Sequence, residues 1–305
     1  MKIQYSVCIP VYNSHQTLET LYERIAATFQ PITDRYEIVL VDDGSTDESW
    51  AALEKIKKRY SNVKAIRLMR NFGQHNALMC AFRYATGEFL ITLDDDLQVF
   101  PEDIPLLIKK MAEGYDVVYG AYQKKKHSLF RNFGSGLVQW VYKKVFRLKE
   151  NLTSFRMVRR QLIELILAYD LNYTFIDGLL AWCTNRIGSV EVRHQARQYG
   201  QSGYHLQKLI TLSINMMTNF SIAPLQTASL LGVILSIAGF LLGIYFILNK
   251  ILFGVPIMGF TATVVIITFF SGVQLLSLGL IGEYIGRVHL NINKKPQYLV
   301  RQTLD

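Results

Sequence analysis

The stretch Tyr36–Asp47, which reads YEIVLVDDGSTD, is the clearest sequence indication of the fold class. Its first six residues are almost entirely apolar, as expected for a strand that is buried on both faces of a parallel sheet. Two aspartates follow at once, and Ser45 and Glu48 have the spacing of a capping box, which predicts a helix that begins there and runs to about Tyr60. A strand, a short polar loop and a helix in this order form half of a βαβ unit.

The same alternation continues on both sides of this stretch. Strands are expected at Tyr5–Val11, Tyr36–Val41, Val63–Leu68, Phe89–Leu93 and Tyr115–Tyr119, and further helices at residues 17–29, 74–85 and 101–112. This order predicts an α/β domain with a doubly wound parallel sheet, which we place at residues 1–204. Ligands of such sheets bind beyond the carboxyl ends of the strands.

The acidic triplet Asp94-Asp95-Asp96 follows one of these strands. In an extended segment the side chains of Asp94 and Asp96 share one side, and the amide oxygen of Gln98 adds a third hard ligand. Such an oxygen-only set suits Mg²⁺ or Mn²⁺, held together with substrate phosphates. A solvated acidic turn that caps the next helix is the alternative, and the position at a strand end favours the metal site.

Asp42 and Asp43 end the second strand in the same way. Aspartates at such a position often cap a helix. They can also accept hydrogen bonds from a nucleotide base or from sugar hydroxyls. The sequence contains neither a P-loop motif nor a dinucleotide-binding glycine fingerprint, so those two modes of nucleotide binding are not supported.

Two long uncharged stretches occupy the C-terminal third of the chain. Leu209–Asn249 has 41 residues and Ile251–Gly282 has 32, and each exceeds the roughly 20 apolar residues that a membrane span needs. We expect a transmembrane hairpin of two helices at residues 226–282, preceded by an amphipathic interface helix at residues 205–225. Two buried core helices are the alternative, but such long helices in a soluble core seldom lack charge on every side.

The net charge of +9 comes mainly from one block, residues 122–160, which holds 11 basic side chains and one acidic side chain. Nucleic acid could use a basic block interleaved with aromatic residues. The adjacent spans favour an anionic membrane surface and a lipid phosphate instead, so we expect membrane lipids and no nucleic acid as partners.

The topology and the compartment follow from charge and cysteine usage. Basic residues precede the hairpin and recur in the tail, residues 283–305, which places both termini and the first domain in the cytoplasm. The three isolated cysteines form no CxxC pair and fit a reducing compartment. We expect a multi-pass protein of the bacterial inner (cytoplasmic) membrane.

Four segments of the chain resemble family 2 glycosyltransferases with the GT-A fold, a Rossmann-like α/β domain. They are Val7–Asn13 (VCIPVYN), Val41–Asp47 (VDDGSTD), Arg70–Ala77 (RNFGQHNA) and Leu93–Gln98 (LDDDLQ). With Gly200–Tyr204 (GQSGY) ahead of two spans, the chain is similar to the polyprenyl-phosphate glycosyltransferases over essentially its whole length.

The resemblance implies three groups of site residues. The nucleotide-sugar site would comprise Pro10, Tyr12, Asn13, Asp42, Asp43, Asp95 and Arg197. The metal site would comprise Asp94, Asp96 and Gln98, and Asp94, Asp96 and Arg131 would form the catalytic set. The lipid-phosphate site would comprise Lys124, Lys125, Ser128 and Arg131.

The chain departs from the family pattern at three positions. Tyr122 stands where an arginine is usual, Gly203 stands where a lysine is frequent, and Asn151 stands near where an aspartate is frequent. Lysines of the run Lys124–Lys126 could replace the missing positive charge.

The implied reaction is an inverting transfer of a sugar from a nucleotide sugar, expected to be a UDP-sugar, to polyprenyl (undecaprenyl) phosphate. It would need Mg²⁺ or Mn²⁺ and would serve cell-envelope glycan or lipid modification by a homo-oligomeric membrane enzyme. The acceptor phosphate has a second pKa of about 6, so it is already an anionic nucleophile near neutral pH.

Two other functions stay open. A membrane polysaccharide synthase shares the fold but usually carries a QxxRW motif and more spans. A non-catalytic nucleotide-sugar-binding membrane scaffold is the second alternative, and the intact acidic triplet argues against it.

Overall fold

The computed structural model describes residues 2–122, 152–169, 174–195, 222–253, 259–293 and 295–305. They belong to two compact units. The first comprises residues of Met1–His205 and Lys294–Asp305, and the second comprises residues of Leu206–Asn293.

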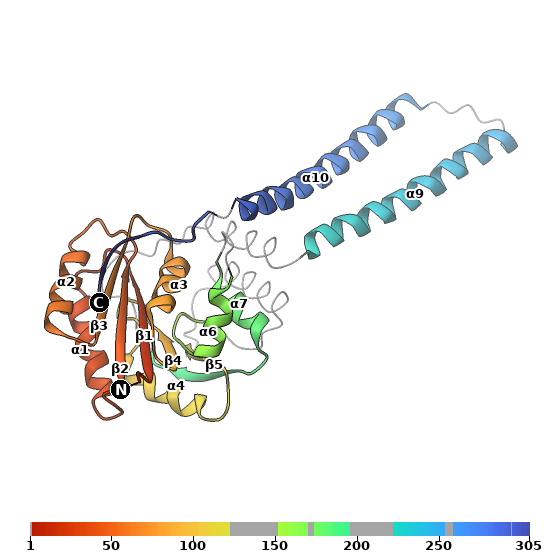
Figure 1. Cartoon of the computed structure of the whole chain (residues 1–305). Helices are drawn as coiled ribbons and strands as arrows, with labels where there is room; N and C mark the ends of the chain where they lie inside the picture. The colour runs from red at the N-terminus through yellow and green to blue at the C-terminus, as the bar shows by residue number, and fades with distance from the viewer. Residues whose placement is uncertain (1, 123–151, 170–173, 196–221, 254–258, 294) are drawn as a thin grey trace. The chain divides into compact units, whose positions relative to one another are not determined.

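The first unit is built on an eight-stranded sheet (Figure 1) with the order β7-β5-β6-β4-β1-β2-β3-β8. Its strands are β1 (Tyr5–Val11), β2 (Tyr36–Asp42), β3 (Val63–Leu68), β4 (Phe89–Thr92), β5 (Val117–Tyr122), β6 (Arg156–Arg159), β7 (Ile187–Val192) and β8 (Val300–Leu304). The five expected strands are present within a few residues of their expected ends. The sheet is mixed rather than fully parallel, because β6 runs antiparallel to β4 and β5, and β8 runs antiparallel to β3.

Helices cover both faces of this sheet. They are α1 (Leu18–Phe29), α2 (Ser49–Arg59), α3 (Gln74–Tyr84), α4 (Ile104–Met111), which follows the 3₁₀ turn η1 (Pro101–Asp103), α6 (Arg160–Leu167) and α7 (Ile176–Cys183). Figure 1 shows α1 and α2 on one side and α3, α6 and α7 on the other. All seven residues of β1 are buried, which explains its continuous apolar sequence.

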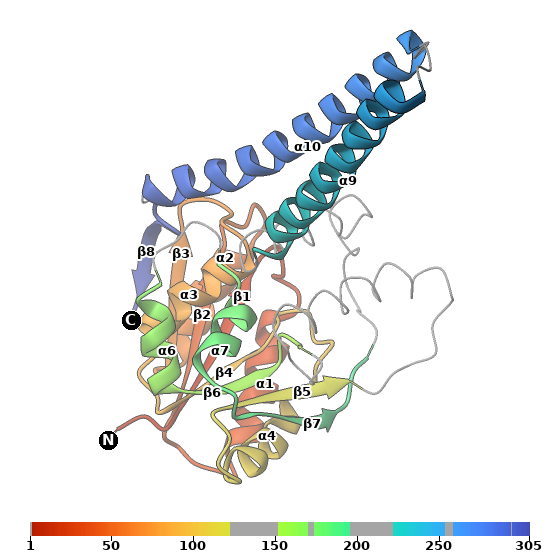
Figure 2. The same cartoon turned by 90° about the vertical axis from the view of Figure 1, so that its right-hand side faces the viewer.

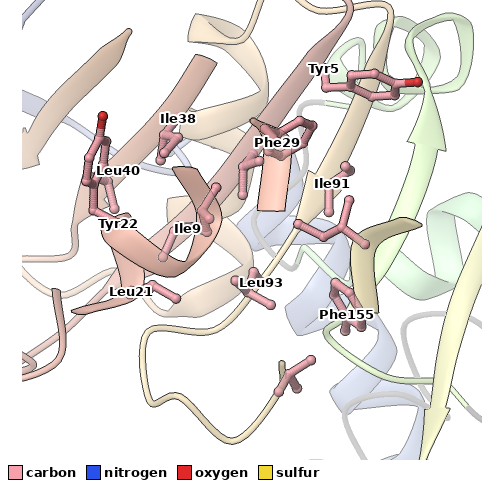
Figure 3. Close-up of a cluster of buried hydrophobic side chains, with 14 of the residues drawn as sticks. Tyr5, Ile9, Leu21, Tyr22, Phe29, Ile38, Leu40, Ile91, Leu93 and Phe155 are labelled. Carbon is pink, nitrogen blue, oxygen red and sulfur yellow. The ribbon is translucent and has the colours of Figure 1, made fainter. Parts of the chain in front are cut away.

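The main hydrophobic core lies between the sheet and α1, α2 and α4. Tyr5, Ile9, Leu21 and Phe29 are among its buried side chains (Figure 3), and alternate residues of β1 contribute to it because successive strand side chains point to opposite faces. This core fixes the central strands, and thereby the loops that follow them.

The expected start of the second helix is wrong. Helix α2 begins at Ser49, with Glu48 at its N-cap position, and not at Ser45. The Ser45 hydroxyl instead accepts a hydrogen bond from the backbone N–H of Asn13 at 3.0 Å. The backbone N–H of Ser45 donates to Asp42 Oδ1 at 3.0 Å, so these residues close a loop instead of opening a helix.

The second unit contains two long helices, α9 (Ala223–Phe253) and α10 (Phe260–Ile292). Ala223–Leu252 contains an 18-residue window with a mean hydropathy of 2.5, and Phe269–Ile292 contains one with a mean of 1.2; no part of either window is buried inside the structure. Both helices are therefore long and apolar enough to cross a membrane. Most of the expected amphipathic helix at 205–225 lies outside the described residues.

The C-terminal end differs from the expected basic tail at 283–305. Helix α10 continues to Ile292, and Val300–Leu304 forms β8 at the edge of the sheet of the first unit. In its register with β3, Leu304 lies opposite Ala65, and the backbone N–H of Met69 donates to the carbonyl of Leu299 at 2.9 Å. The chain thus returns to its first domain after the second long helix.

Candidate active site

The carboxyl ends of β4, β1 and β2 lie together because these three strands are parallel neighbours in the sheet. The acidic triplet follows β4, and Asp95 is held by the loop that follows β1. Asp95 Oδ2 accepts hydrogen bonds from the backbone N–H of Tyr12 at 3.0 Å and from the hydroxyl of Ser14 at 2.5 Å. The Thr17 hydroxyl donates to the Asp95 carbonyl at 2.6 Å. Asp95 therefore joins two loops of the site.

Asp94 is held by two side chains from distant parts of the chain. Gln74 Nε2, at the start of α3, donates to Asp94 Oδ1 at 2.7 Å, and the Ser154 hydroxyl, just before β6, donates to Asp94 Oδ2 at 2.5 Å. Burial raises the pKa of Asp94 to about 6, and the charges of Asp96 and Asp95 add to this rise. A bound cation would relieve this crowding of negative charge.

Asp96 and Gln98 complete the expected metal site. The backbone N–H of Gln98 donates to Asp96 Oδ1 at 3.1 Å. Across the described parts of the chain, no group of three or more His, Cys, Asp and Glu side chains is arranged to hold a metal. A cation here would have two carboxylates and an amide oxygen from the protein. This fits Mg²⁺ or Mn²⁺, which are commonly bound by one or two carboxylates together with phosphate oxygens.

Asp43 fastens the loop after β3. Its two carboxylate oxygens accept hydrogen bonds from the backbone N–H groups of Phe72 at 2.7 Å and Gly73 at 2.8 Å. Gly44 packs against the same loop, since a Cβ atom on it would lie 2.5 Å from the carbonyl carbon of Arg70. The φ of Gly44 is also +70°, so glycine is favoured there on both counts. Burial raises the pKa of Asp43 to about 6.

The structure does not place Asp42 and Pro10 where they could contact a ligand directly. Asp42 has no exposed surface, and its Oδ2 lies 3.3 Å from Nε of Arg67. Pro10 is a buried residue of β1. Tyr12 and Asn13, in contrast, are exposed at the strand ends, and Tyr12 is 47% exposed. Asp42 and Pro10 therefore shape the site from within.

Five expected site residues lie outside the described residues. They are Lys124, Lys125, Ser128, Arg131 and Arg197.

Ser14, Thr17, Gln74 and Ser154 are site residues that the sequence reasoning missed. Each hydrogen bonds to Asp94 or Asp95 across 20 to 81 residues of sequence. Gln74 lies within the RNFGQHNA segment, which was the one available signal for it.

A buried polar network lies on strands next to the triplet. Arg156 of β6 is 1% exposed and forms an ion pair through Nη1 with Asp177 of α7. The Tyr119 hydroxyl donates to the same carboxylate oxygen at 2.9 Å. In the register of β4 and β6, Arg156 lies opposite Thr92, and Thr92 is two residues before Asp94 in the sequence. The network therefore ties α7 to the strands that position the triplet.

His75 of α3 lies within the electrostatic influence of Asp177 and Arg156, and it should make stability pH-dependent. Burial lowers the pKa of His75 from 6.5 to about 4, while Asp177 raises it and Arg156 lowers it further. The unfolded chain then binds more protons than the folded one between these values. The contribution of His75 to stability is complete above pH 6.5 and is lost as the pH falls toward 4. For this residue alone we expect a loss of about 1–2 kcal/mol between pH 7 and pH 5, while the raised pKa values of Asp94 and Asp43 act in the opposite direction.

The measurement is the melting temperature of the purified protein at pH 7 and pH 5. His75→Leu removes the titrating group, so from pH 7 to pH 5 its melting temperature should rise relative to that of the wild type. An equal change in the two proteins would contradict this role of His75.

A model of the family described as glycosyl transferase family 2 matches residues 6–169. The chain belongs to glycosyltransferase family 2. The matched region runs from β1 into the residues just after α6 and contains the triplet, Asp43 and the loop at residues 70–73. The resemblance expected from the sequence is confirmed.

Two members of the family span nearly the whole chain. The undecaprenyl-phosphate 4-deoxy-4-formamido-L-arabinose transferase of Serratia proteamaculans is 37% identical over 305 residues, covering 98% of this chain and 93% of that protein. The transferase of the same name from Proteus mirabilis is 37% identical over 304 residues, with the same coverage.

A solved structure shares the fold. Glucosyl-3-phosphoglycerate synthase from Mycobacterium tuberculosis, in complex with Mn²⁺, UDP and glucosyl-3-phosphoglycerate, has a TM-score of 0.50 and 19% identity. The similarity covers 71% of this chain and 78% of that one. The sheet and its helices thus form a GT-A domain.

Proposed function

We propose that this chain transfers a sugar from a nucleotide sugar to undecaprenyl phosphate at the bacterial inner membrane. One observation carries the proposal: the carboxylate triplet lies at the strand ends of a family 2 domain that is joined to two apolar helices. The relatives whose names state undecaprenyl-phosphate transfer align with both parts, since the match covers 98% of this chain.

Asp94 and Asp96, with the amide oxygen of Gln98, would hold Mg²⁺ or Mn²⁺ together with the donor diphosphate. When bound, the cation would neutralise the charge that develops on the leaving diphosphate. Gln74 and Ser154 orient Asp94 toward this task through their hydrogen bonds. The structural relative was solved with Mn²⁺ and UDP, which supports a UDP-sugar as the donor.

The nucleoside would lie over the ends of β1 and β2, where Tyr12 and Asn13 are exposed. Asp43 supports this region by fixing the loop at residues 70–73, and Asp95 fixes the loop that carries Tyr12. These contacts hold the pocket in shape before the ligand arrives, which lowers the entropy cost of binding.

The acceptor phosphate would be bound by the basic block, through Lys124, Lys125, Ser128 and Arg131, and Arg197 would contact the diphosphate. Arginine suits such a position because its planar guanidinium binds phosphate oxygens in a bidentate way. The phosphate needs no strong general base because it is already an anion near neutral pH.

The test is turnover by the purified protein with undecaprenyl phosphate and a panel of nucleotide sugars. The panel contains UDP-4-deoxy-4-formamido-L-arabinose, UDP-glucose and UDP-N-acetylglucosamine, and the product is a lipid-linked sugar detected by mass spectrometry. We expect one donor to be transferred with Mg²⁺ or Mn²⁺ present. Binding of a donor without turnover of any would favour the non-catalytic scaffold.

The pairing of β8 with β3 supports a defined membrane topology. Both strands belong to one sheet, so the chain must return after α10 to the side from which it left. An even number of crossings satisfies this, and α9 and α10 supply two. With the basic residues on the same side, both termini and the catalytic domain would be cytoplasmic.

Cysteine labelling of intact cells tests this topology. In a Cys183→Ser background, Gly259→Cys at the start of α10 should react with an impermeant maleimide added outside the cell. Leu299→Cys, which is 49% exposed in the structure, should react only after permeabilisation. Labelling of Leu299→Cys in intact cells would contradict a cytoplasmic C-terminus.

A further inference from the structure

Two aromatic side chains lie side by side at the ends of β5 and β7. The rings of Tyr122 and His194 have centroids 4.3 Å apart and an angle of 43° between their planes. Tyr122 ends β5, and His194 follows β7, which pairs in parallel with β5 (Figure 2). The pair therefore lies at the same edge of the sheet as the acidic triplet. We call Tyr122 and His194 the aromatic pair.

Backbone hydrogen bonds hold the His194 side of the aromatic pair against the loop that follows the triplet. His194 forms an isolated bridge with Val99, and the backbone N–H of Gln195 donates to the carbonyl of Gln98 at 2.9 Å. Gln195 Nε2 also donates to the carbonyl of Leu97 at 2.6 Å. These contacts hold His194 at a fixed position relative to Asp96.

Tyr122 reaches toward Asp94. Burial raises the pKa of Tyr122 to about 12, and the nearby negative charges of Asp94 and Asp96 add to this rise. The half-buried ring of Tyr122 thus extends from the carboxylates to the exposed ring of His194.

The strand order sets the direction in which a nucleotide sugar would lie. The strands run β5-β6-β4-β1-β2, and neighbouring strands are about 4.8 Å apart. A nucleoside over β1 and β2 and a diphosphate at the triplet after β4 leave the sugar on the far side of β4, toward β6 and β5. The aromatic pair lies on that side.

The chemistry of the aromatic pair suits a sugar ring better than a phosphate. An aromatic face carries negative charge density and attracts the polarised C–H groups of a sugar. The ring of Tyr122 offers a diphosphate no positive charge. We propose that the aromatic pair contacts the sugar ring of the donor and not its nucleotide portion. This inference rests on the proposed function.

The test compares the binding of UDP-4-deoxy-4-formamido-L-arabinose, UDP-glucose and UDP to the full-length protein in detergent with Mn²⁺, by calorimetry. Tyr122→Ala should weaken the binding of at least one UDP-sugar by about fivefold to tenfold, because a whole ring is lost. It should leave the dissociation constant of UDP within twofold. Tyr122→Phe keeps the ring and should retain most of the affinity for the sugar nucleotide.

His194→Ala provides a second variant that does not depend on Tyr122, since the His194 ring is exposed and its removal should not prevent folding. It should weaken UDP-sugar binding by a few fold, again without affecting UDP. Trp182→Ala is the matched control, because Trp182 is a 59% exposed aromatic residue of α7. This control should change neither affinity.

Each other outcome overturns the inference. Equal weakening of UDP and UDP-sugar would place the aromatic pair at the nucleotide portion, and unchanged affinities in both variants would remove it from the site. A wild-type protein that binds neither UDP nor any UDP-sugar would overturn the proposed donor as well. If both variants bind UDP-sugar and UDP with the wild-type affinities, the inference about the aromatic pair is overturned while the proposed donor stands.

Discussion

Asp96→Asn is expected to lower kcat/KM for sugar transfer by about 10²–10³-fold, the range found when one stabilising group at a developing charge is removed. The substitution removes a hard anionic ligand at the end of β4 but keeps the size of the side chain. Asp96 is only half-buried, so the fold should persist. The measurement is transfer to undecaprenyl phosphate at several metal concentrations, with circular dichroism as the check on folding.

Asp95→Asn is the matched control for this prediction. Asp95 Oδ2 is occupied by the N–H of Tyr12 and the hydroxyl of Ser14, so its main task is to join two loops. It should affect the melting temperature more than the metal dependence. Full turnover by the wild type in excess chelator would contradict the metal site.

Arg156→Met is expected to destabilise the catalytic domain by about 3–5 kcal/mol, the usual cost of breaking a buried ion pair from one side. The variant would leave the carboxylate of Asp177 buried and without its cation. The hydroxyl of Tyr119 would remain as its donor. For a domain of this size the melting temperature should fall by about 10 °C.

The double variant Arg156→Met/Asp177→Asn should recover part of this loss, because no uncompensated charge remains. Arg59→Met is the control at an exposed pair, since Arg59 Nη1 lies 3.2 Å from Glu19 Oε1 and the two side chains are 63% and 67% exposed. It should cost under about 1 kcal/mol. If Arg156→Met and Arg59→Met proved equally mild, the buried network would not stabilise the domain.

The central part of the fold was accessible from the sequence because its strands are buried on both faces. The apolar runs of β1 and β2 indicate strands that are buried on both faces. The carboxylates that follow such runs lie at one edge of a parallel sheet. The edge position of the triplet therefore needed only local patterns and one topological rule.

The contacts that orient those carboxylates were not accessible in the same way. Ser154 reaches Asp94 because β6 inserts antiparallel between β4 and β5, and no local pattern predicts that insertion. Asp42 and Asp43 look alike in the sequence, yet one is enclosed beside Arg67 and the other holds the loop at residues 72–73. Whether a polar side chain is buried depends on residues that are distant in sequence. Strand pairing and helix packing determine which of those residues lie next to it.

Strand β8 also sets the order in which the protein can be completed during synthesis. Its partner β3 leaves the ribosome more than two hundred residues earlier, and α9 and α10 are made in between. At about 5–20 residues per second, the outer edge of β3 stays unpaired for on the order of ten seconds or more. An open edge can pair with other chains, so membrane insertion of the two helices must precede the step that closes the sheet. A chain that stops before Val300 would keep this edge open throughout its life.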